Sequence, residues 1–530
     1  MNTSGYTGEL ATLRRHSQYS TESLPLYQAL SRPGDNSLLL DSAEIDSKAD
    51  LKSLMLLDAA VRIACHGLNV TMEALTDNGY NLLVFLTEQF ESNVAVELNE
   101  RRLTLTFPEP DRDSDEDTRL KSHSPVDGLR TIINTVKTES DLNEALFIGG
   151  AFSYDFIGTF ESLPDVPNGT NQCPDYLFYV AETLLLQDHQ QQQCELIGSV
   201  FSGPNSQTNQ ANIEQRLQDI ATLCENFTSK PITTTETVTS KVSVDVSDVE
   251  FCRQVETLKS YIRKGDIFQV VPSRSFSLEC PCSLSAYGKL KETNPSPYMF
   301  YLNDQDFVLF GASPESAIKY CHQSNDVEIY PIAGTRRRGF NPDGSINKDL
   351  DGRIELELRL DKKEMSEHLM LVDLARNDVA RISEPGTRHV ADLLKVDRYS
   401  HVMHLVSRVV GKLRSDLDAL HAYQACMNMG TLTGAPKIRA SELIRETEQQ
   451  RRGSYGGAVG YLTGQGEMDT CIVIRSAFVQ NQVAHVQAGA GVVYDSKPQA
   501  EADETRSKAA AVLNAIAQAH GTTLEAVNNA

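Results

Sequence analysis

The sequence predicts an α+β protein built on antiparallel sheet. Segments with the helical spacing of apolar residues alternate irregularly with β-rich segments at hairpin distance, which argues against a doubly wound parallel sheet. With 40% hydrophobic residues, the chain of 530 residues can bury a large core, and this excludes a disordered or fibrous protein.

The expected elements of the second half begin with a helix over Val249–Arg263, where Phe251, Val255 and Leu258 recur at helical spacing. The β-rich segment Ile267–Leu278 follows directly. Further strands are expected at Met299–Leu302, Phe307–Phe310, Val327–Pro331, Ala458–Leu462, Cys471–Val479 and Val483–Ala488. Further helices are expected at Lys363–Asn377, Pro436–Glu448 and Glu501–His520.

Charge and composition exclude several functions. The chain has 49 basic and 72 acidic residues, so its net charge is −23, which disfavours binding to nucleic acid or to an anionic membrane surface. No apolar run has the roughly 20 residues of a membrane-spanning helix, and the first residues lack the apolar core of a signal peptide. The 10 cysteines are scattered, as in a cytoplasmic protein with reduced thiols.

Two polar stretches divide the chain. Pro108–His123 carries an acidic run, but it lacks the Gly and Glu of a calcium loop and is interpreted as a solvated loop. The stretch 202–247 is rich in Ser, Thr, Asn and Gln and is interpreted as a polar linker. We therefore expect a first region at 1–201, a second region at 248–520 that carries most chemical signals, and a tail at 521–530.

Two expected helices carry paired carboxylates. Glu364 and Glu367 lie three residues apart in one helix, and Glu501 and Glu504 lie three apart in another, so each pair shares a helix face. Four converging carboxylates would repel one another unless a cation lies among them, and Mg²⁺ prefers oxygen ligands. The alternative is an exposed acidic face on each helix.

Other motifs remain ambiguous from their residues alone. The Gly-rich turn at 430–437 does not have the spacing of a phosphate-binding loop. Gly489-Ala490-Gly491 follows a strand and is either a tight bend, which the pattern favours, or a backbone-amide site for a carboxylate. His401 and His404 have apolar neighbours and are each either core histidines or a general base. No nucleophile elbow is present, so no glutaminase activity is expected from this chain.

Seven motifs, taken in order and spacing, resemble the chorismate-utilising enzymes, and within them the anthranilate-forming type that tryptophan inhibits. They are PIAGTRRRG (331–339), EHLMLVDLARND (367–378), HLVSRVVG (404–411), GTLTGAPK (430–437), RRGSYGGAVGY (451–461), IVIRSA (472–477) and QAGAGVVYDSKPQAEADETRSKA (487–509). The resemblance extends from about Ser37 to Gln518. It implies two antiparallel-rich sheets packed in a sandwich with helices outside.

The resemblance assigns metal and substrate residues. Glu367 and Glu504 match the direct Mg²⁺ ligands, supported by Glu364 and Glu501. The residues that match substrate contacts are Gly334, Thr335, Thr431, Tyr455, Arg475, Gly489, Ala490, Gly491 and Lys508. The region 248–520 would then be the chorismate-binding catalytic domain.

The resemblance also implies a reaction. Glu315 matches the acid that protonates the departing C4 hydroxyl of chorismate while ammonia attacks C2, which gives 2-amino-2-deoxyisochorismate. His404 matches the base that removes the C2 proton, after which pyruvate leaves and anthranilate forms; His401 matches no family role. The ammonia would come from a glutamine amidotransferase subunit, in a heterotetramer.

Two positions distinguish this chain from related synthases. Gln269 stands where isochorismate and salicylate synthases place a water-activating Lys, and Ala333 stands where aminodeoxychorismate synthase has a nucleophilic Lys. Both differences favour attack by ammonia and anthranilate as the product.

The first region resembles the tryptophan-binding regulatory region of the family. Ser42 and Lys52 match one wall of the tryptophan pocket, and Pro297, Tyr298 and Met299 match the second wall. Asp41 stands where Glu is more common in the family, and Arg337 departs from the usual PIAGTRPRG, on a loop expected to be distant from the chemistry.

Overall fold

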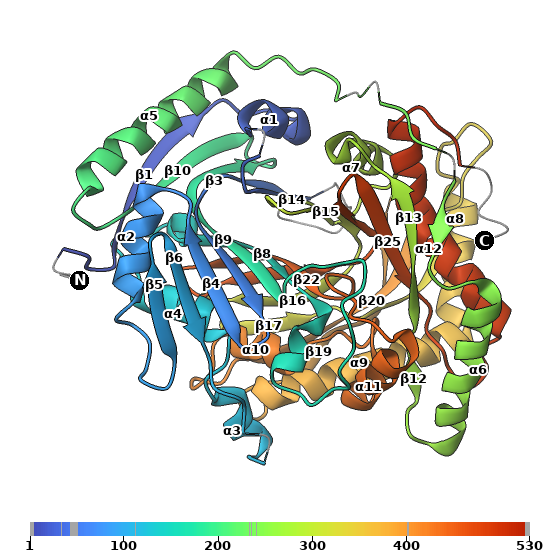
Figure 1. Cartoon of the computed structure of the whole chain (residues 1–530). Coiled ribbons are helices and arrows are strands. Elements are labelled where there is room, and N and C mark those ends of the chain that lie inside the picture. The colour runs from blue at the N-terminus through green and yellow to red at the C-terminus, as the bar shows by residue number, and fades with distance from the viewer. Residues whose placement is uncertain are drawn as a thin grey trace.

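The computed structural model describes residues 5–32, 34–42, 51–111, 113–232, 234, 236–239, 241–399 and 402–524. In this part of the chain, 23 strands form one hydrogen-bonded network, which divides into two sheets that share the long strands β3 and β9. Figure 1 shows the first half of the chain on the left and the C-terminal helix on the right. No described helix is long and apolar enough to cross a membrane.

Sheet I is antiparallel except for its last pair of strands. In spatial order it consists of β11 (Ser243–Val244), β13 (Ser273–Glu279), β25 (Val483–Gly489), β24 (Ser476–Gln480), β15 (Val308–Ser313), β14 (Tyr298–Asn303), β2 (Ser37–Asp41), β3 (Lys52–His66), β9 (Tyr176–Asp188), β10 (Gln193–Phe201), β1 (Glu9–Ser17) and β7 (Lys137–Thr138). Strands from both halves of the sequence therefore lie in one sheet.

Sheet II is antiparallel throughout. Its order is β5 (Ala95–Asn99), β6 (Arg102–Thr106), β4 (Asn69–Ala74), β3, β9, β8 (Phe147–Phe152), β22 (Ala458–Thr463), β23 (Met468–Ile472), β16 (Ser316–Cys321), β17 (Asp326–Ile329) followed by β18 (Ile332–Arg337), β20 (Val402–Lys412) and β19 (His389–Arg398). A separate pair joins β12 (Gln269–Val270) to β21 (Gly434–Ala435).

The two sheets face each other across a shared apolar core. Leu38, Phe300 and Leu309 of sheet I contact Phe147 and Val459 of sheet II in this core. Side chains alternate between the two faces of a strand, and β14 shows how this builds the core. Tyr298, Phe300 and Leu302 point between the sheets. Met299 and Tyr301 point to the helices outside. The expected sandwich of two antiparallel-rich sheets with helices outside is confirmed.

Helices cover the outer faces of both sheets. Sheet I is covered by α1 (Ser23–Leu30), α5 (Ser206–Glu225), α7 (Ser283–Thr293) and α12 (Pro498–Ala519). Sheet II is covered by α2 (Asp77–Leu86), α4 (Asp127–Thr135), α9 (Lys362–Ile382) and α10 (Ala419–Cys426). The remaining helices are α3 (Glu116–Lys121), α6 (Asp248–Lys264), α8 (Lys348–Leu360), α11 (Lys437–Glu448) and the short 3₁₀ turns Asn143–Ala145 and Tyr154–Thr159.

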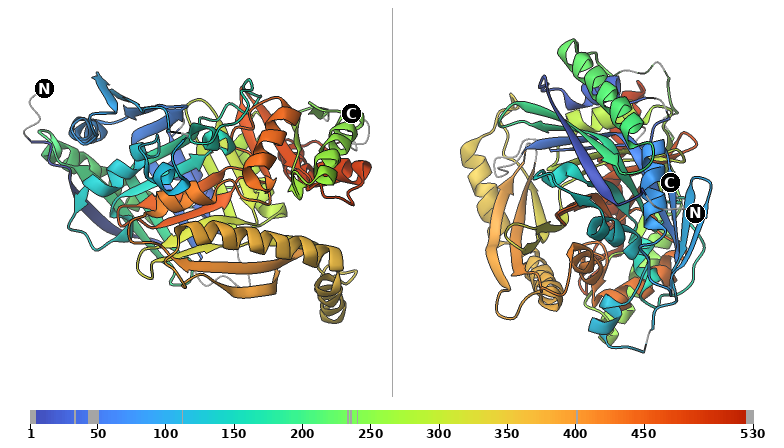
Figure 2. Two further views of the ribbon diagram at one scale, coloured as in Figure 1. Left: turned by 90° about the horizontal axis from the view of Figure 1, so that it is seen from below. Right: turned by 90° about the vertical axis from the view of Figure 1, so that its left-hand side faces the viewer.

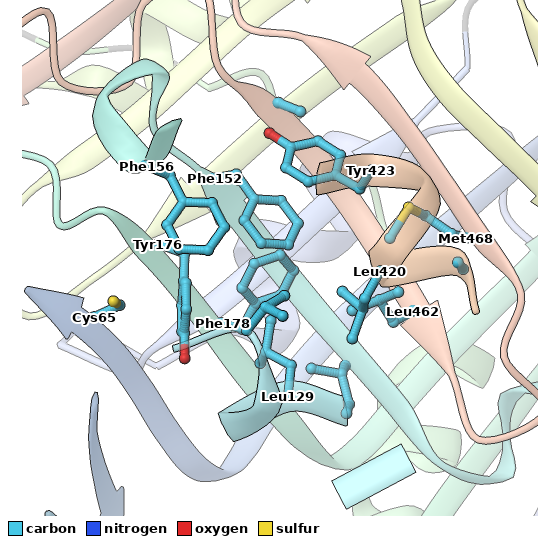
Figure 3. Packing of buried hydrophobic residues seen from close by; sticks show 14 of the residues in the cluster. Cys65, Leu129, Phe152, Phe156, Tyr176, Phe178, Leu420, Tyr423, Leu462 and Met468 are labelled. Atoms are coloured by element: carbon cyan, nitrogen blue, oxygen red, sulfur yellow. The ribbon is translucent and has the colours of Figure 1, made fainter. Parts of the chain in front are cut away.

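Aromatic packing fixes α10 against sheet II. The rings of Phe152 and Tyr423 stack with centroids 4.1 Å apart, and Phe178 meets Phe152 edge-on at 4.7 Å (Figure 3). The gold helix α9 runs along strands β19 and β20 (Figure 2). Contact between α9 and β20 is close enough that a Cβ on Gly411 would lie 2.7 Å from Val379.

The stretch 202–247, which was predicted as a polar linker, contains α5. Ile213, Leu217, Ile220 and Cys224 of α5 form a buried stripe in the same core as β10. Most other positions of α5 are polar and exposed, and they dominated the composition. In Figure 1, α5 lies along the outside of β1 and β10. The tail expected at 521–530 begins after α12, and its described residue Thr522 donates a hydrogen bond to the Val238 carbonyl.

Two expected strands are each divided in the structure. Ile267–Leu278 is interrupted at Pro272, which has no backbone N–H for a sheet ladder, so it forms β12 and β13. Cys471–Val479 is interrupted before β24, where Arg475 has a left-handed backbone with φ 48°. The structure overturns the expectation of a continuous strand there, and the break lies at a candidate site residue.

Candidate active site

Two helix starts bring the four predicted carboxylates into one region. Asp361 is the N-cap of α9 and accepts hydrogen bonds from the backbone N–H groups of Lys363 and Glu364, which fixes the first turn of the helix. Glu501 lies in the first turn of α12. The negative charges of Glu364 and Glu504 both help burial to raise the pKa of Glu367, so residues of the two helices act on each other.

Three of these carboxylates are paired with basic side chains. Arg336 donates to Glu364 Oε1 over 2.9 Å, and Lys508 Nζ lies 2.8 Å from Glu504 Oε1. Lys363 Nζ lies 3.6 Å from Glu367 Oε1. The fourth carboxylate is that of Glu501. This residue is buried, and the burial raises the pKa of its carboxyl. The expected convergence of acids thus comes with basic partners that the spacing of the acids did not indicate.

The residues fit Mg²⁺ only as an ion shared with a substrate. In the described residues, no three or more His, Cys, Asp or Glu side chains form a group that could hold a metal ion by themselves. Mg²⁺ commonly binds through one or two carboxylates, retained waters and a substrate anion, and it does not require a complete protein cage. The four carboxylates supply oxygen ligands, and a cation among them would relieve their mutual repulsion. They are therefore compatible with Mg²⁺ that is shared with a substrate.

Glu315 is a buried acid at the turn between β15 and β16. Its backbone N–H and carbonyl are fixed by Ser313 and Ile472. Burial raises the pKa of Glu315 to about 8, although the Thr431 hydroxyl and the positive charges of Lys508 and Arg475 oppose the rise. The carboxyl is therefore mostly protonated at neutral pH, which suits a general acid.

His404 is a buried, neutral imidazole on β20. Its Nδ1 lies 2.9 Å from Thr335 Oγ1 on the paired strand β18, and the Tyr399 ring packs edge-on with centroids 5.1 Å apart. Burial, followed by the positive charge of Arg475, lowers the pKa of His404 to about 3. Its Nε2 is buried with no hydrogen-bond partner in the described structure, and in the tautomer whose Nδ1–H donates to Thr335 this nitrogen can accept a proton.

Arg475 acts electrostatically on both the candidate acid and the candidate base, because its positive charge lowers the pKa of Glu315 and of His404. Burial lowers the pKa of its guanidinium, while the nearby Tyr399 and Glu315 raise it. Within the described residues, this guanidinium has no hydrogen-bond acceptor and no ion-pair partner. A cation held in a largely desolvated place without a counter-ion is a strong site for a carboxylate, because the two charges compensate each other's desolvation.

The predicted glycines form close backbone walls. A Cβ on Gly489 would lie 3.0 Å from the Tyr455 hydroxyl, and a Cβ on Gly491 would lie 3.0 Å from Gln269 Nε2. Gly334 has φ +83°, and a Cβ there would lie 3.3 Å from Glu364 Oε2. The Ala490 N–H donates to the Pro272 carbonyl, so this amide is committed to the bend.

The predicted effector residues lie on neighbouring strands. Met299 of β14 pairs with Asp41 of β2, immediately before Ser42, and Lys52 begins β3 on the other side of β2. Tyr298 pairs with Ser313, two residues before Glu315, so β14 and β15 connect the predicted effector segment with the candidate acid. Residues 43–50 and His401 lie outside the described residues.

Sequence reasoning missed a buried polar cluster at Asp41. Ser23 donates to Asp41 Oδ2 over 2.5 Å, Ser53 donates to Oδ1 over 2.7 Å, and Lys291 of α7 forms an ion pair with the same carboxylate. These residues come from four separate segments and share no local motif. The only signal in the sequence was Asp41 itself, at a position where the family more often has Glu.

Residues 96–514 match the model of the family described as chorismate binding enzyme. The chain belongs to the chorismate-binding enzymes, among the anthranilate synthase component 1 proteins. It is 58% identical to anthranilate synthase component 1 of Vibrio parahaemolyticus over 514 residues, which cover 97% of this chain and 94% of the relative. It is 54% identical to the Escherichia coli protein of the same name over 520 residues, which cover 98% of this chain and 99% of that protein.

Two solved structures share the fold of this chain. Anthranilate synthase component I from Streptococcus pneumoniae is 29% identical with a TM-score of 0.66, covering 89% of this chain and 94% of that one. The menaquinone-specific isochorismate synthase from Escherichia coli has a TM-score of 0.67 at 17% identity, covering 96% and 95% of the two chains. The second likeness concerns the fold alone, and it confirms the chorismate-utilising architecture.

Proposed function

We propose that this chain is the large subunit of anthranilate synthase, which converts chorismate and ammonia to anthranilate and pyruvate in the first step of tryptophan biosynthesis. The observation that supports it best is the arrangement around Arg475. A protonated carboxyl at Glu315 and a neutral imidazole at His404 both feel the charge of one partly buried guanidinium, so an acid, a base and an anion site are combined.

The first step uses Glu315 as the acid. The guanidinium of Arg475 holds a carboxylate of chorismate, and the walls at Gly489, Gly491 and Tyr455 limit how the substrate lies. Ammonia forms a bond to C2, the ring double bonds shift, and the C4–O bond breaks. Glu315 gives its proton to the departing hydroxyl, which leaves as water, and the intermediate is 2-amino-2-deoxyisochorismate.

The second step uses His404 as the base. Its free Nε2 accepts the proton from C2, the ring becomes aromatic, and the bond from C3 to the enolpyruvyl oxygen breaks. The leaving enolpyruvate takes up a proton to become pyruvate. The hydrogen bond between Nδ1 and Thr335 keeps the imidazole oriented through the cycle.

Mg²⁺ would be held by Glu367 and Glu504, with Glu364 and Glu501 in support. When bound, the ion would supply positive charge to the ring carboxylate of the substrate and offset the repulsion among these acids. Two residues of the chain fix the position of these acids: Asp361 caps the start of α9, and Arg336 orients Glu364 through a hydrogen bond.

Ammonia is favoured over water as the nucleophile because the chain offers no amine at the two discriminating positions. Gln269 is buried beside Gly491, and its Oε1 has no hydrogen-bond partner among the described atoms. An amide is too weak a base to activate water, whereas ammonia needs no activation. Ala333 cannot act as a nucleophile.

Ammonia would come from a glutamine amidotransferase partner, within a cytoplasmic heterotetramer. The test uses the purified chain with chorismate, Mg²⁺ and either an ammonium salt or glutamine. Fluorescent anthranilate is expected with ammonium and not with glutamine. Aminodeoxychorismate as the product would refute the proposed reaction, and turnover of glutamine by the pure chain would refute the need for a partner.

L-Tryptophan is proposed as a feedback inhibitor that binds between Ser42, Lys52 and the segment Pro297–Met299. The pairing of Tyr298 with Ser313 offers a route to Glu315. Replacing Ser42 by Phe is expected to abolish inhibition by tryptophan while turnover without tryptophan is retained. If inhibition of this variant equals that of the unmodified chain, the pocket lies elsewhere.

A further inference from the structure

The proposed metal region contains cations of its own. Arg336 bonds Glu364 and also Asp361, so it is anchored between two carboxylates. Lys508 is likewise anchored, because its ammonium also donates to the Gly489 carbonyl over 2.9 Å. Both groups are therefore fixed parts of the site and cannot leave without breaking other bonds.

Lys363 differs from these two residues in its position and freedom. It lies in the first turn of α9, four residues before Glu367. Among the described residues, the ion pair with Glu367 at 3.6 Å is the only ion pair or hydrogen bond of its side chain. The charges of Glu367, Glu501, Glu364 and Glu504 all act on its ammonium, so it lies within the field of the complete set. Its side chain is 69% exposed and can turn to solvent at little cost.

We propose that Lys363 is a resident counter-ion of the four carboxylates, which a divalent cation must displace from Glu367 in order to bind. This inference rests on the proposed function, since it assumes that the carboxylates hold Mg²⁺. An ammonium and Mg²⁺ compete for the same carboxylate oxygen, and they also repel each other at short range. The resident ammonium therefore weakens binding of the free metal.

The exchange has a consequence for the order of binding. An anionic substrate adds negative charge to the region. This charge attracts the metal, and so it helps the metal to displace Lys363 from Glu367. Metal binding is then coupled to substrate binding: Mg²⁺ alone binds weakly, and Mg²⁺ with an anionic substrate binds more tightly. The coupling acts through the charge balance of this chain's own residues.

The experiment compares Lys363→Met with Lys362→Met in the full chain. Lys362 is the neighbouring lysine on the same helix turn. It is exposed and forms no ion pair with any described residue. Its replacement therefore removes the same charge without removing the proposed counter-ion. Titration of each variant with MgCl₂ alone by calorimetry measures the dissociation constant without reference to activity.

We expect Mg²⁺ to bind Lys363→Met about three- to tenfold more tightly than the unmodified chain, from the loss of one short-range repulsion in water-like surroundings. Lys362→Met should change the constant less than about twofold, because its charge is screened. The difference should shrink at high ionic strength. Equal affinities of the two variants would overturn the proposal.

Thermal unfolding supplies a second readout. Without Mg²⁺, Lys363→Met should melt at a lower temperature than Lys362→Met, because its acids lose their counter-ion, and MgCl₂ should restore more of its stability. Equal melting temperatures and equal shifts would also overturn the counter-ion role. Failure of the proposed function itself would look different, since the unmodified chain would then neither bind Mg²⁺ nor need it for turnover.

Discussion

The protonation state of Glu315 gives the most specific prediction for this protein. Burial raises the pKa of this carboxyl from the ordinary 4.5 to about 8. Roughly nine-tenths of Glu315 is then protonated at pH 7, and roughly one-tenth at pH 9. If Glu315 is the general acid, kcat/KM for chorismate should fall about tenfold between these two pH values.

The raised pKa of Glu315 also makes the free energy of unfolding depend on pH, because the folded chain binds this proton more tightly than the unfolded chain. Because the pKa is raised in the folded state, the stabilising protonated form is fully retained below pH 4.5 and is lost as the pH rises through about 8. The loss is on the order of 5 kcal/mol over this window, at about 1.4 kcal/mol for each pKa unit. Glu315→Gln removes the charge while nearly keeping the shape, so it should be more stable than the unmodified chain at pH 9 by a few kcal/mol.

The assay measures anthranilate fluorescence from pH 6.5 to 9.5 with the free ammonia concentration held constant, together with urea unfolding at pH 5 and pH 9. Glu315→Gln should lose about two to four orders of magnitude in rate, since an amide cannot donate the proton. A rate that stays level up to pH 9.5, or a Gln variant with more than a tenth of the activity, would refute the role of Glu315. A Gln variant that gains no stability at pH 9 would refute its burial as a protonated acid.

Three further predictions concern other parts of the structure. His404→Ala should still consume chorismate but release anthranilate and pyruvate at least about a hundredfold more slowly; chorismate that stays unconsumed would remove the two-step assignment. Gly334→Ala should lower the free energy of unfolding by about 1–2 kcal/mol in urea, because φ +83° disfavours a side chain and Glu364 Oε2 lies 3.3 Å from the new Cβ. Lys291→Met should cost about 3–5 kcal/mol at pH 7, because it leaves the Asp41 carboxylate buried and unpaired, whereas Lys289→Met on the same helix should cost less than about 1 kcal/mol. Burial would raise the pKa of Asp41, but Lys291 and the two serines lower it overall. The stabilisation by this ion pair is therefore present above the ordinary pKa of 3.8 and is lost as the pH falls below that value. Equal losses of stability for both lysine variants at pH 7 would contradict the ion pair.

Local patterns predicted several elements well. The spacing of Phe251, Val255 and Leu258 predicted α6, whose ends are fixed by the Ser247 N-cap and by Gly265 in the left-handed region. These signals lie within a few residues of each other, so the sequence contains all the information that the element needs. The acids at the starts of α9 and α12 were predicted for the same reason.

Long-range packing decided what the patterns could not. The stripe of α5 was hidden by its polar face, and only contact with β10 identifies it as a packed helix. The break at Arg475 depends on sheet geometry, since the residues around it read as a continuous strand. The division of β3 and β9 between two sheets depends on their pairing with each other, although the two strands lie far apart in the sequence.

The sequence by itself determined the family, the helix starts that carry the acids, and the identity of the residues that match the reaction. The tertiary structure decided their chemical state. Glu315 is protonated and His404 is neutral because each is buried, and because the groups that oppose or reinforce burial, among them Arg475 and Lys508, come from distant segments. Desolvation and charge act through space, and a linear pattern of residues does not contain those distances.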